Sequence, residues 1–538
     1  RENDTFRGRL LWTPSDELTI DAFVNIDDLY GGTYHFSTIV DETGRAVFGN
    51  GAASHDWPVQ AEVLTTGDRK FEEAALNVTF EPGFGGTIKY SFALHDYEEH
   101  YGLPGTAAGG IIDPTYPTGN YDMTPLYAIH NSQSFWRESM LNEIRYISDS
   151  DKSVRYVIGA QLVNVEMMDL LPAFINEYFF PNAAGEFPGV IADNVNAGRP
   201  LTFGMGSVPM FGPVNFSDTS RNIDALGYYA QVNVDITPNT ELTLAYRRDE
   251  DERDWTENAS GIYDERTFSG GMPKVSVAHT LSDNRMVYAT VSKGWRSGGF
   301  NKIADQSDTT AFSQLFKEEE VMSYEIGYKS SFNEGRGRFN FAIFQQDVDN
   351  HQHFVFIAAQ AGQITATIPE GTVDGIEFEL THALDNGFEY GIAGGYIDSE
   401  ITEFDGIALG YGRPMSEASG EPVLGAQFPS IDQKQLNLHA QYATDTDFGE
   451  MIARVDWNHK GDKQWFIVKG QNEEGNRNFL NASLILDMNK LELMLWGENL
   501  TDEDSWGSFE PKSLHNLPQD IANLAPGRRY GLKATYRF

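Results

Sequence analysis

The chain has 538 residues and carries 39 Lys and Arg against 79 Asp and Glu, so its formal net charge is −40. This charge argues against nucleic acid as a partner, and the absence of cysteine excludes disulfides, thiolate nucleophiles and cysteine-based metal sites. No stretch reaches the ~18–20 apolar residues of a membrane helix, which leaves a soluble acidic protein or one that crosses a membrane without helices.

Alternating segments recur in pairs from the first strand, expected at about residues 5–13. The clearest covers residues 226–236, LGYYAQVNVDI, where every second residue is apolar and the residues between are mostly polar. A strand has a side-chain period of two, so this segment has one apolar and one polar face. The same alternation occurs at 88–94, 376–380, 436–442 and 480–486. Helical periodicity is not sustained over a comparable length, so the sequence predicts an all-β protein.

Short turns and long connections alternate along the whole chain. Nine short turns rich in Pro, Gly, Asn, Asp or Ser lie near residues 14, 82, 149, 238, 283, 335, 386, 445 and 488. The longer connections cover roughly 27–68, 97–131, 172–219, 251–271, 297–319, 348–370, 399–429, 467–476 and 501–526. Outer-membrane barrels have short turns at one end and long loops at the other. Nine hairpins and a final strand therefore predict a transmembrane antiparallel β-barrel with about 19 strands.

A large soluble all-β protein such as a propeller is the alternative. Propeller repeats have fixed periods of ~40–50 residues, whereas the spacing between strand pairs here is irregular. The last ten residues, RYGLKATYRF, also favour the barrel. Their outward positions are predicted to be Tyr530, Leu532, Ala534, Tyr536 and Phe538. A lipid-facing last strand would have this pattern, and it resembles the segment by which the barrel assembly machinery recognises its substrates.

Four motifs in the second half of the chain resemble one family. They are VSKGWRSGGFN at 291–301, EEEVMSYEIGYKSSF at 318–332, DGIEFEL at 374–380 and LWGENLTDEDSW at 495–506. With the terminal Phe538 they follow the order found in TonB-dependent outer-membrane receptors. The first half, for example RLLWTPSDELTI at 9–20, matches that family in style more than in motif.

The resemblance implies a barrel of the 22-stranded type with a plugged lumen. An odd strand count whose first strand enters from outside leads us to expect that the N-terminal plug and about three strands lie outside this chain. The implied function is uptake of a scarce nutrient across a Gram-negative outer membrane, with energy from the TonB complex acting through the plug. A ferric siderophore or other chelate, cobalamin and an oligosaccharide all remain open as ligands. The implied surroundings are outer-membrane lipid and lipopolysaccharide.

A passive, porin-like diffusion channel is the rival function, and a structural or adhesive surface barrel is a third. No catalytic motif is present, so we expect neither an enzyme nor a cofactor.

Candidate ligand contacts come from the predicted loops. Segment 111–136 presents Tyr116, Tyr121, Tyr127 and Trp136, which suit stacking on a ligand but equally suit loop packing or an interfacial belt. Arg296 is a candidate for attracting an anionic ligand.

His351 and His353 form an H-x-H pair whose rings would share a face and could bind a metal. His95 and His100, near three carboxylates, form a second candidate. Solvated loop histidines are the alternative for both pairs. The acidic runs 249–252 and 318–320 read as solvated loop faces, or as sites for cations that bridge lipopolysaccharide phosphates.

Overall fold

The computed structural model describes residues 2–31, 37–38, 66–104, 128–176, 214–301, 315–357, 362–404, 407–409, 413–415, 423–469, 473–510 and 521–538. Within these ranges the protein consists of strands, turns and irregular segments, without a helix. In this part of the chain, no helix is both long and apolar enough to cross a membrane.

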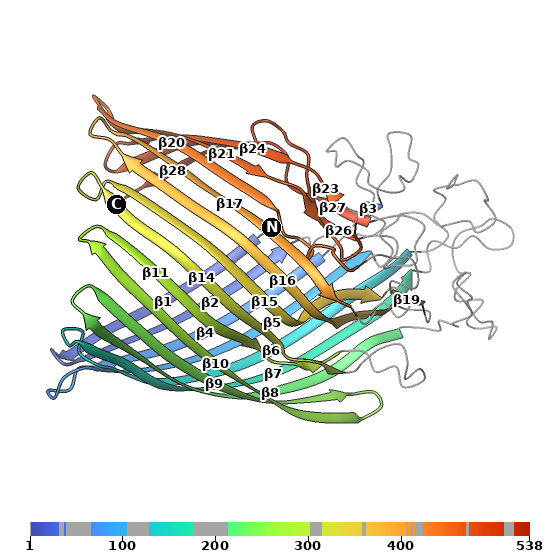
Figure 1. Cartoon of the computed structure of the whole chain (residues 1–538). Helices are drawn as coiled ribbons and strands as arrows, with labels where there is room; N and C mark the ends of the chain where they lie inside the picture. Colours follow the sequence, from blue (N-terminus) through green and yellow to red (C-terminus); the bar gives the residue numbers. More distant parts are fainter. Residues whose placement is uncertain are drawn as a thin grey trace, which may run out of the picture.

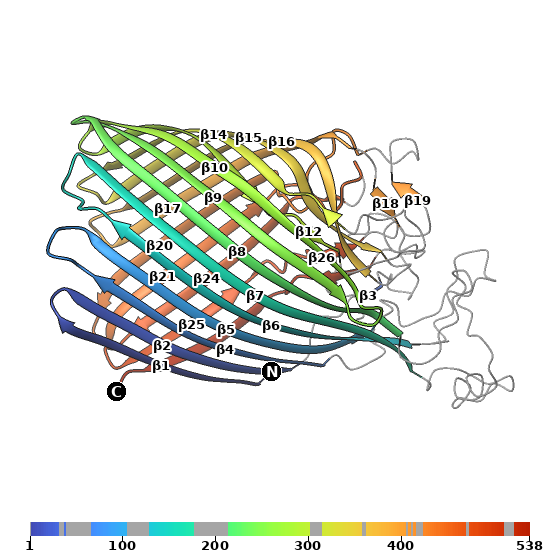
Figure 2. The same ribbon diagram turned by 90° about the horizontal axis from the view of Figure 1, so that it is seen from below.

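One antiparallel sheet of 19 strands dominates the fold, as the sequence predicted. Each strand pairs with its neighbours in chain order, and the sheet curls into a barrel-shaped wall (Figures 1 and 2). The strands are β1 (Glu2–Ser15), β2 (Leu18–Gly31), β4 (Thr66–Phe80), β5 (Thr87–Pro104), β6 (Ala128–Ile147), β7 (Val154–Asn176), β8 (Val214–Thr237), β9 (Thr240–Glu257), β10 (Ile262–Ser282), β11 (Arg285–Arg296), β14 (Glu319–Phe332), β15 (Gly337–Ile357), β16 (Gly362–Ala383), β17 (Phe388–Glu403), β20 (Lys434–Thr446), β21 (Gly449–Lys460), β24 (Arg477–Asp487), β25 (Leu491–Glu498) and β28 (Arg529–Tyr536).

Short strands outside this sheet form small ladders near one end of the wall (Figure 2). They are β3 (Ser37–Thr38), β12 (Gly299–Phe300), β13 (Leu315–Phe316), β18 (Ile407–Leu409), β19 (Arg413–Met415), β22 (Lys463–Gln464), β23 (Glu473–Glu474), β26 (Trp506–Glu510) and β27 (Ile521–Leu524). Strands β1 and β28 are the two edges of the large sheet. No pairing joins these edges among the described residues.

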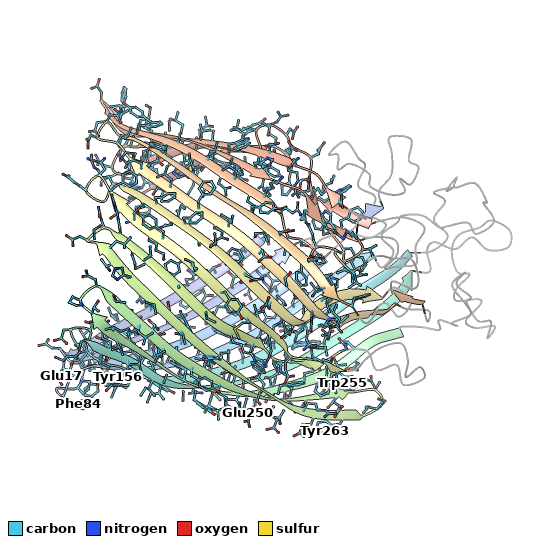
Figure 3. All side chains as sticks on the ribbon, viewed as in Figure 1. Glu17, Phe84, Tyr156, Glu250, Trp255 and Tyr263 are labelled. Carbon is cyan, nitrogen blue, oxygen red and sulfur yellow. The ribbon has the colours of Figure 1, made fainter. Side chains whose placement is uncertain are left out.

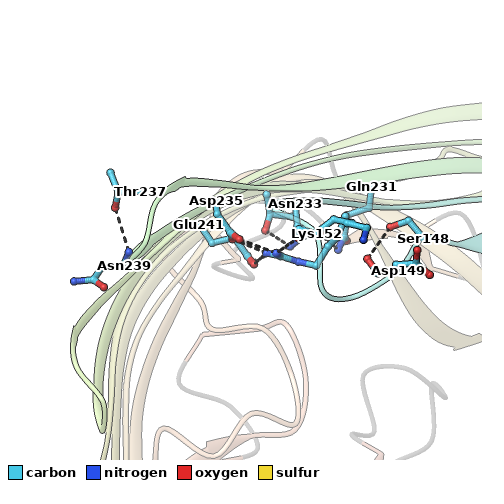
Figure 4. Close-up of polar contacts among 11 residues, drawn as sticks. Ser148, Asp149, Lys152, Gln231, Asn233, Asp235, Thr237, Asn239 and Glu241 are labelled. Atoms are coloured by element: carbon cyan, nitrogen blue, oxygen red, sulfur yellow. Dashed lines mark hydrogen bonds and ion pairs between the residues drawn. The ribbon is translucent and has the colours of Figure 1, made fainter. Parts of the chain in front are cut away.

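The short turns lie at one end of the wall, which we call the turn end; the opposite end is the loop end (Figure 1). Polar contacts tie neighbouring turns together at the turn end (Figure 4). Arg155 donates to Asp235 at 2.7 and 2.8 Å and also contacts Glu241. Asn233 donates to Glu241 at 2.8 Å. These contacts link β7, β8 and β9 where the strands reverse.

The wall is apolar outside and polar inside, the reverse of a soluble protein. Leu226 and Tyr228 are 43% and 48% exposed, while Gly227 between them is buried and Tyr229 after them is less accessible. The inward Tyr229 hydroxyl donates to Glu143 at 2.6 Å, and Arg247 donates to Gln161 at 3.0 Å. An apolar outer face suits lipid, and a polar inner face suits a wet lumen.

The final strand follows the same rule. Tyr530, Leu532, Tyr536 and Phe538 are exposed, in agreement with the predicted outward face of RYGLKATYRF. Among the turn-end side chains in Figure 3, Phe84 and Tyr156 are also exposed aromatics.

Several predicted long connections are wrong, because the strands continue well past the apolar stretch. The range 251–271 is a hairpin of β9 and β10, with only residues 258–261 between the strands. The range 348–370 is largely the β15–β16 ladder, paired as far as Ile357 and Gly362. The backbone ladder persists here while polar residues interrupt the apolar alternation, so the period-two hydrophobic pattern disappears although the strand does not.

Neighbouring residues of β15 test the orientation of the wall. Ile343 is 42% exposed on the outer face, and Ala342 lines an internal cavity. We expect Ile343→Arg to lower the free energy of unfolding in lipid vesicles by about 2–4 kcal/mol, the cost of a cation near the bilayer midplane. Ala342→Arg, the matched control, faces water and two carboxylates and should change it much less. Equal losses in urea titrations of the two variants would contradict this orientation.

Candidate functional site at the loop end

An apolar cluster sits on the inner face of the wall near the loop end. Ser399 and Ile401 lie on the face opposite the exposed Tyr396, and segment 423–428 packs on them. The Ser399 hydroxyl accepts a hydrogen bond from the Phe428 amide at 3.1 Å. We call the whole cluster the loop-end core; its buried members are Val348, Ile368, Ile401, Val423, Ala426, Phe428, Phe466, Ile467 and Val468.

The sequence predicts a loop at His351 and His353, but both residues lie in β15. They face the loop-end core. The His351 ring packs on Phe428 with centroids 4.7 Å apart, and the His353 ring packs on Phe466 at 5.8 Å. Residues 348 and 351 of a regular strand would point to opposite faces. Asn350 has a φ of 53°, and this left-handed residue turns both histidines toward the side that Val348 occupies.

The two histidine rings share a face, as the sequence predicted, with centroids 6.4 Å apart. His351 Nδ1 lies 3.3 Å from Glu319 Oε2, while His353 Nε2 is buried and has no hydrogen-bond partner. Over the described ranges, no group of three or more His, Asp or Glu side chains is arranged to hold a metal ion. Metal binding by this pair therefore stays a prediction.

Arg296 begins a strut, residues 296–301, that crosses the inner face of the wall. Its guanidinium pairs with Glu319. A Cβ on Gly298 would lie 2.5 Å from the Phe268 ring, so the strut passes too close to β10 for any larger residue. At its far end the Asn301 side chain accepts from the Thr365 amide at 2.7 Å and donates to the Thr365 carbonyl at 3.1 Å. The motif RSGGFN thus joins β11 to β16.

A buried ion network anchors a second group of loop-end segments. Arg477, 3% exposed, pairs with Asp432 and with Glu474, the latter at 2.6 Å. Glu474 also accepts hydrogen bonds from Ser505 and from the Trp506 amide. Lys463 of β22 lies 3.5 Å from Glu474, and burial lowers the pKa of its ammonium group, partly offset by that carboxylate. The network connects segments that are distant in sequence.

The inner wall between β11 and β20 has an open cavity of about 440 Å³. Polar side chains line much of it. The Tyr288 hydroxyl donates to Glu325 at 2.6 Å, and Asn340 donates to Glu379 at 3.2 Å. Lys329 lies over the Tyr288 ring. This polar lining can form hydrogen bonds with a polar solute. Its described side chains are not arranged for covalent catalysis.

The remaining candidates fall elsewhere. Trp136 lies in β6 and not in a loop; it has the same strand parity as the exposed Ile144, and therefore faces outward. Its indole donates to Glu98 at 3.0 Å, which also contacts His100 at 2.9 Å. His95 contacts Glu73 at 3.0 Å. Tyr116, Tyr121 and Tyr127 lie outside the described residues.

Comparison with known sequences identifies the protein family. The family model for the TonB dependent receptor-like β-barrel matches residues 12–500. The chain belongs to this family. Its relatives are receptors and transporters, so this TonB-dependent receptor barrel is not an enzyme, as predicted.

A curated relative, the probable TonB-dependent siderophore receptor PiuA of Acinetobacter baumannii, is 23% identical over 232 residues. That match covers 42% of this chain and 30% of the length of the relative. The ferric yersiniabactin uptake receptor FyuA of Yersinia pestis has the same fold, with a TM-score of 0.72 at 14% identity over 100% of this chain and 71% of its own. The ferric-catecholate import receptor Fiu of E. coli K12 gives a TM-score of 0.70 at 14% identity, covering 100% and 75%.

The strut of this receptor barrel can be tested through Asn301. In Asn301→Ala both hydrogen bonds to the Thr365 backbone are lost. We expect the Thr365 amide to exchange with solvent deuterium about five- to tenfold faster, which corresponds to about 1 kcal/mol for a buried hydrogen bond. Asn340→Ala, which removes a side-chain bond elsewhere on the inner wall, is the control. An unchanged Thr365 amide in the first variant would show that the strut does not hold β16.

Proposed function

We propose that this chain forms the barrel of an outer-membrane receptor that imports a ferric siderophore with energy from TonB. The single observation that carries the proposal is the family match over residues 12–500, on a wall whose apolar side faces outward. We propose a ferric siderophore as the cargo because the names of the relatives include siderophore and ferric-chelate receptors. The lumen then serves as the path for the chelate.

We also propose how the unpaired edges are completed. Both faces of β1 are open, with Phe6, Leu10, Leu11 and Trp12 all more than half exposed. About three further strands, as in a 22-stranded barrel, would pair with β1 and β28 and leave no edge in lipid. A plug domain inside the lumen would then engage TonB. Lipid and lipopolysaccharide around the wall, and the barrel assembly machinery acting on the last strand, belong to the same proposal.

Ligand capture is assigned to the loop end. The candidates from the sequence are Tyr116, Tyr121 and Tyr127, which lie outside the described residues; aromatic rings offer contact area at low entropic cost. The net charge of −40 disfavours a strongly anionic chelate unless cationic side chains gather locally. Arginines that face the lumen therefore affect which chelates can bind.

Uptake in cells tests this proposal. Cells that lack their own siderophore receptors and express the full gene should accumulate ⁵⁵Fe from at least one chelate in a panel of catecholate, hydroxamate and carboxylate siderophores. Uptake should stop when a protonophore collapses the proton gradient. Replacing Tyr116, Tyr121 and Tyr127 together by Ala should raise the KM for uptake by about tenfold, the scale of lost aromatic anchors. Tyr263→Ala, an exposed aromatic on the outer side (Figure 3), is the matched control.

Two outcomes would contradict the proposal. Uptake that continues without the proton gradient would indicate a passive diffusion channel. Failure of every ferric chelate to support uptake, with the receptor present in the outer membrane, would exclude a siderophore receptor.

A further inference from the structure

Buried hydrogen-bond donors without an acceptor gather on the inner face of β8 and β9. Ten buried side-chain atoms in the described residues have no partner. Four of them belong to neighbouring inward positions: Thr219 Oγ1, Arg221 Nε, Arg253 Nε and Trp255 Nε1. Arg221 is directly opposite Trp255 in the β8–β9 register. Thr219 and Arg253 are the next inward positions on either side of this pair.

These four side chains are withdrawn from water to different degrees. Thr219 and Trp255 are 0% exposed, whereas the Arg253 side chain is 24% exposed. Buried polar groups in folded proteins almost always have a partner, and an exception calls for an explanation such as a bound ligand. All four atoms can donate a hydrogen bond, so the missing partner is an acceptor.

The charges around the cluster restrict what that acceptor is. Arg221, Arg253 and Arg266 share this inner face with Asp169, Asp251 and Asp264, as their strand parity shows. Asp251 accepts from Arg253 Nη2 at 3.0 Å, and Asp169 accepts from Gln133 at 3.1 and 3.2 Å. Glu257 lies opposite Thr219 on the same face and accepts from the Ala259 and Ser260 amides. Carboxylates therefore outnumber guanidinium groups by four to three, and the surroundings suit a singly charged group better than a polyanion.

The strut covers the cluster from the lumen side. Phe300 stacks on Trp255 with ring centroids 6.5 Å apart and planes at 23°. A Cβ on Gly299 would lie 3.3 Å from Arg253 Nη1, so the glycine allows the strut to lie against the guanidinium. Trp255 thus stacks on one ring while its indole N–H has no acceptor. The partly exposed Arg253 is where a group arriving from the lumen would make first contact.

We propose that Thr219, Arg221, Arg253 and Trp255 form a carboxylate-binding site on the lumen wall. A carboxylate has two oxygens that can accept several of these hydrogen bonds at once, and it pairs readily with guanidinium groups. The site takes a carboxylate carried by the imported iron chelate. This identity of the ligand rests on the proposed function, but carboxylate binding itself can be measured without uptake.

The test uses the full chain purified in detergent and calorimetric titration with acetate. Wild type should bind acetate saturably. Arg253→Gln and Trp255→Phe, which each remove a donor, should weaken binding by about tenfold or more, the scale of a hydrogen bond to a charged group. Arg247→Gln is the matched control, because this inward arginine of β9 is already partnered by Asp249 and Gln161. It should bind acetate like wild type.

Thr219→Val guards against loss of folding, since it removes the hydroxyl and keeps the shape. Without acetate its unfolding midpoint should equal or exceed that of wild type, and added acetate should stabilise it less. No saturable acetate binding to wild type, or an equal loss in Arg247→Gln, would overturn the site.

Two iron chelates test whether the site binds a carboxylate that belongs to the cargo. Ferric citrate should compete with acetate for the site, and a ferric tris-catecholate, which has no carboxylate, should not. Acetate binding without competition by ferric citrate would overturn the link to cargo. If acetate and ferric citrate both bind but cells take up no iron chelate, the proposed function fails and the carboxylate site stands.

Discussion

The structure depends on one constraint: a backbone that crosses lipid must find all its hydrogen bonds inside the protein. The chain meets it with 19 strands that pair in sequence order. Every strand except β1 and β28 has a partner on both sides. Because those two edges are the exception, they are also the places where lipid could reach unpaired backbone groups, and they define where the wall is incomplete among the described residues.

The same constraint sets the distribution of side chains. Pairing consumes the backbone polar groups, so the outer side chains are free to be apolar and the inner ones to be polar. The inner polar groups then pair among themselves, as Tyr229 does with Glu143 and Arg454 with Asp456. Order at the loop end comes from separate contacts: the loop-end core, the ion network around Arg477 and the strut. These hold irregular segments against the wall where lipid no longer dictates the pattern.

Strand number, turn positions and the outward face were predictable from the sequence because each follows from a period of two combined with turn residues. Strand ends were not. Above the lipid the outer face meets water, so residues such as Asp254 and Glu265, which are paired in the β9–β10 ladder, continue the strands without any apolar alternation. The same loss of alternation makes the sequence predict a loop at Trp136, which lies in β6. The inward turn of His351 depends on the left-handed φ of Asn350. Asparagine tolerates this conformation, but its presence in a sequence does not predict it.

Burial also explains why the candidate site could be predicted only in part. The charge of Arg296 predicts a contact with an anionic ligand, yet Glu319 neutralises that charge and Arg296 begins the strut. Arg221 and Arg253 lie in strands and belong to no motif, so nothing in their spacing distinguishes them from other inward arginines such as Arg247. The distinction is three-dimensional: Arg247 Nε and Nη2 have partners in Asp249 and Gln161, whereas the Nε atoms of the other two are buried without an acceptor. A donor that has lost water without gaining an acceptor marks a binding site more specifically than charge alone.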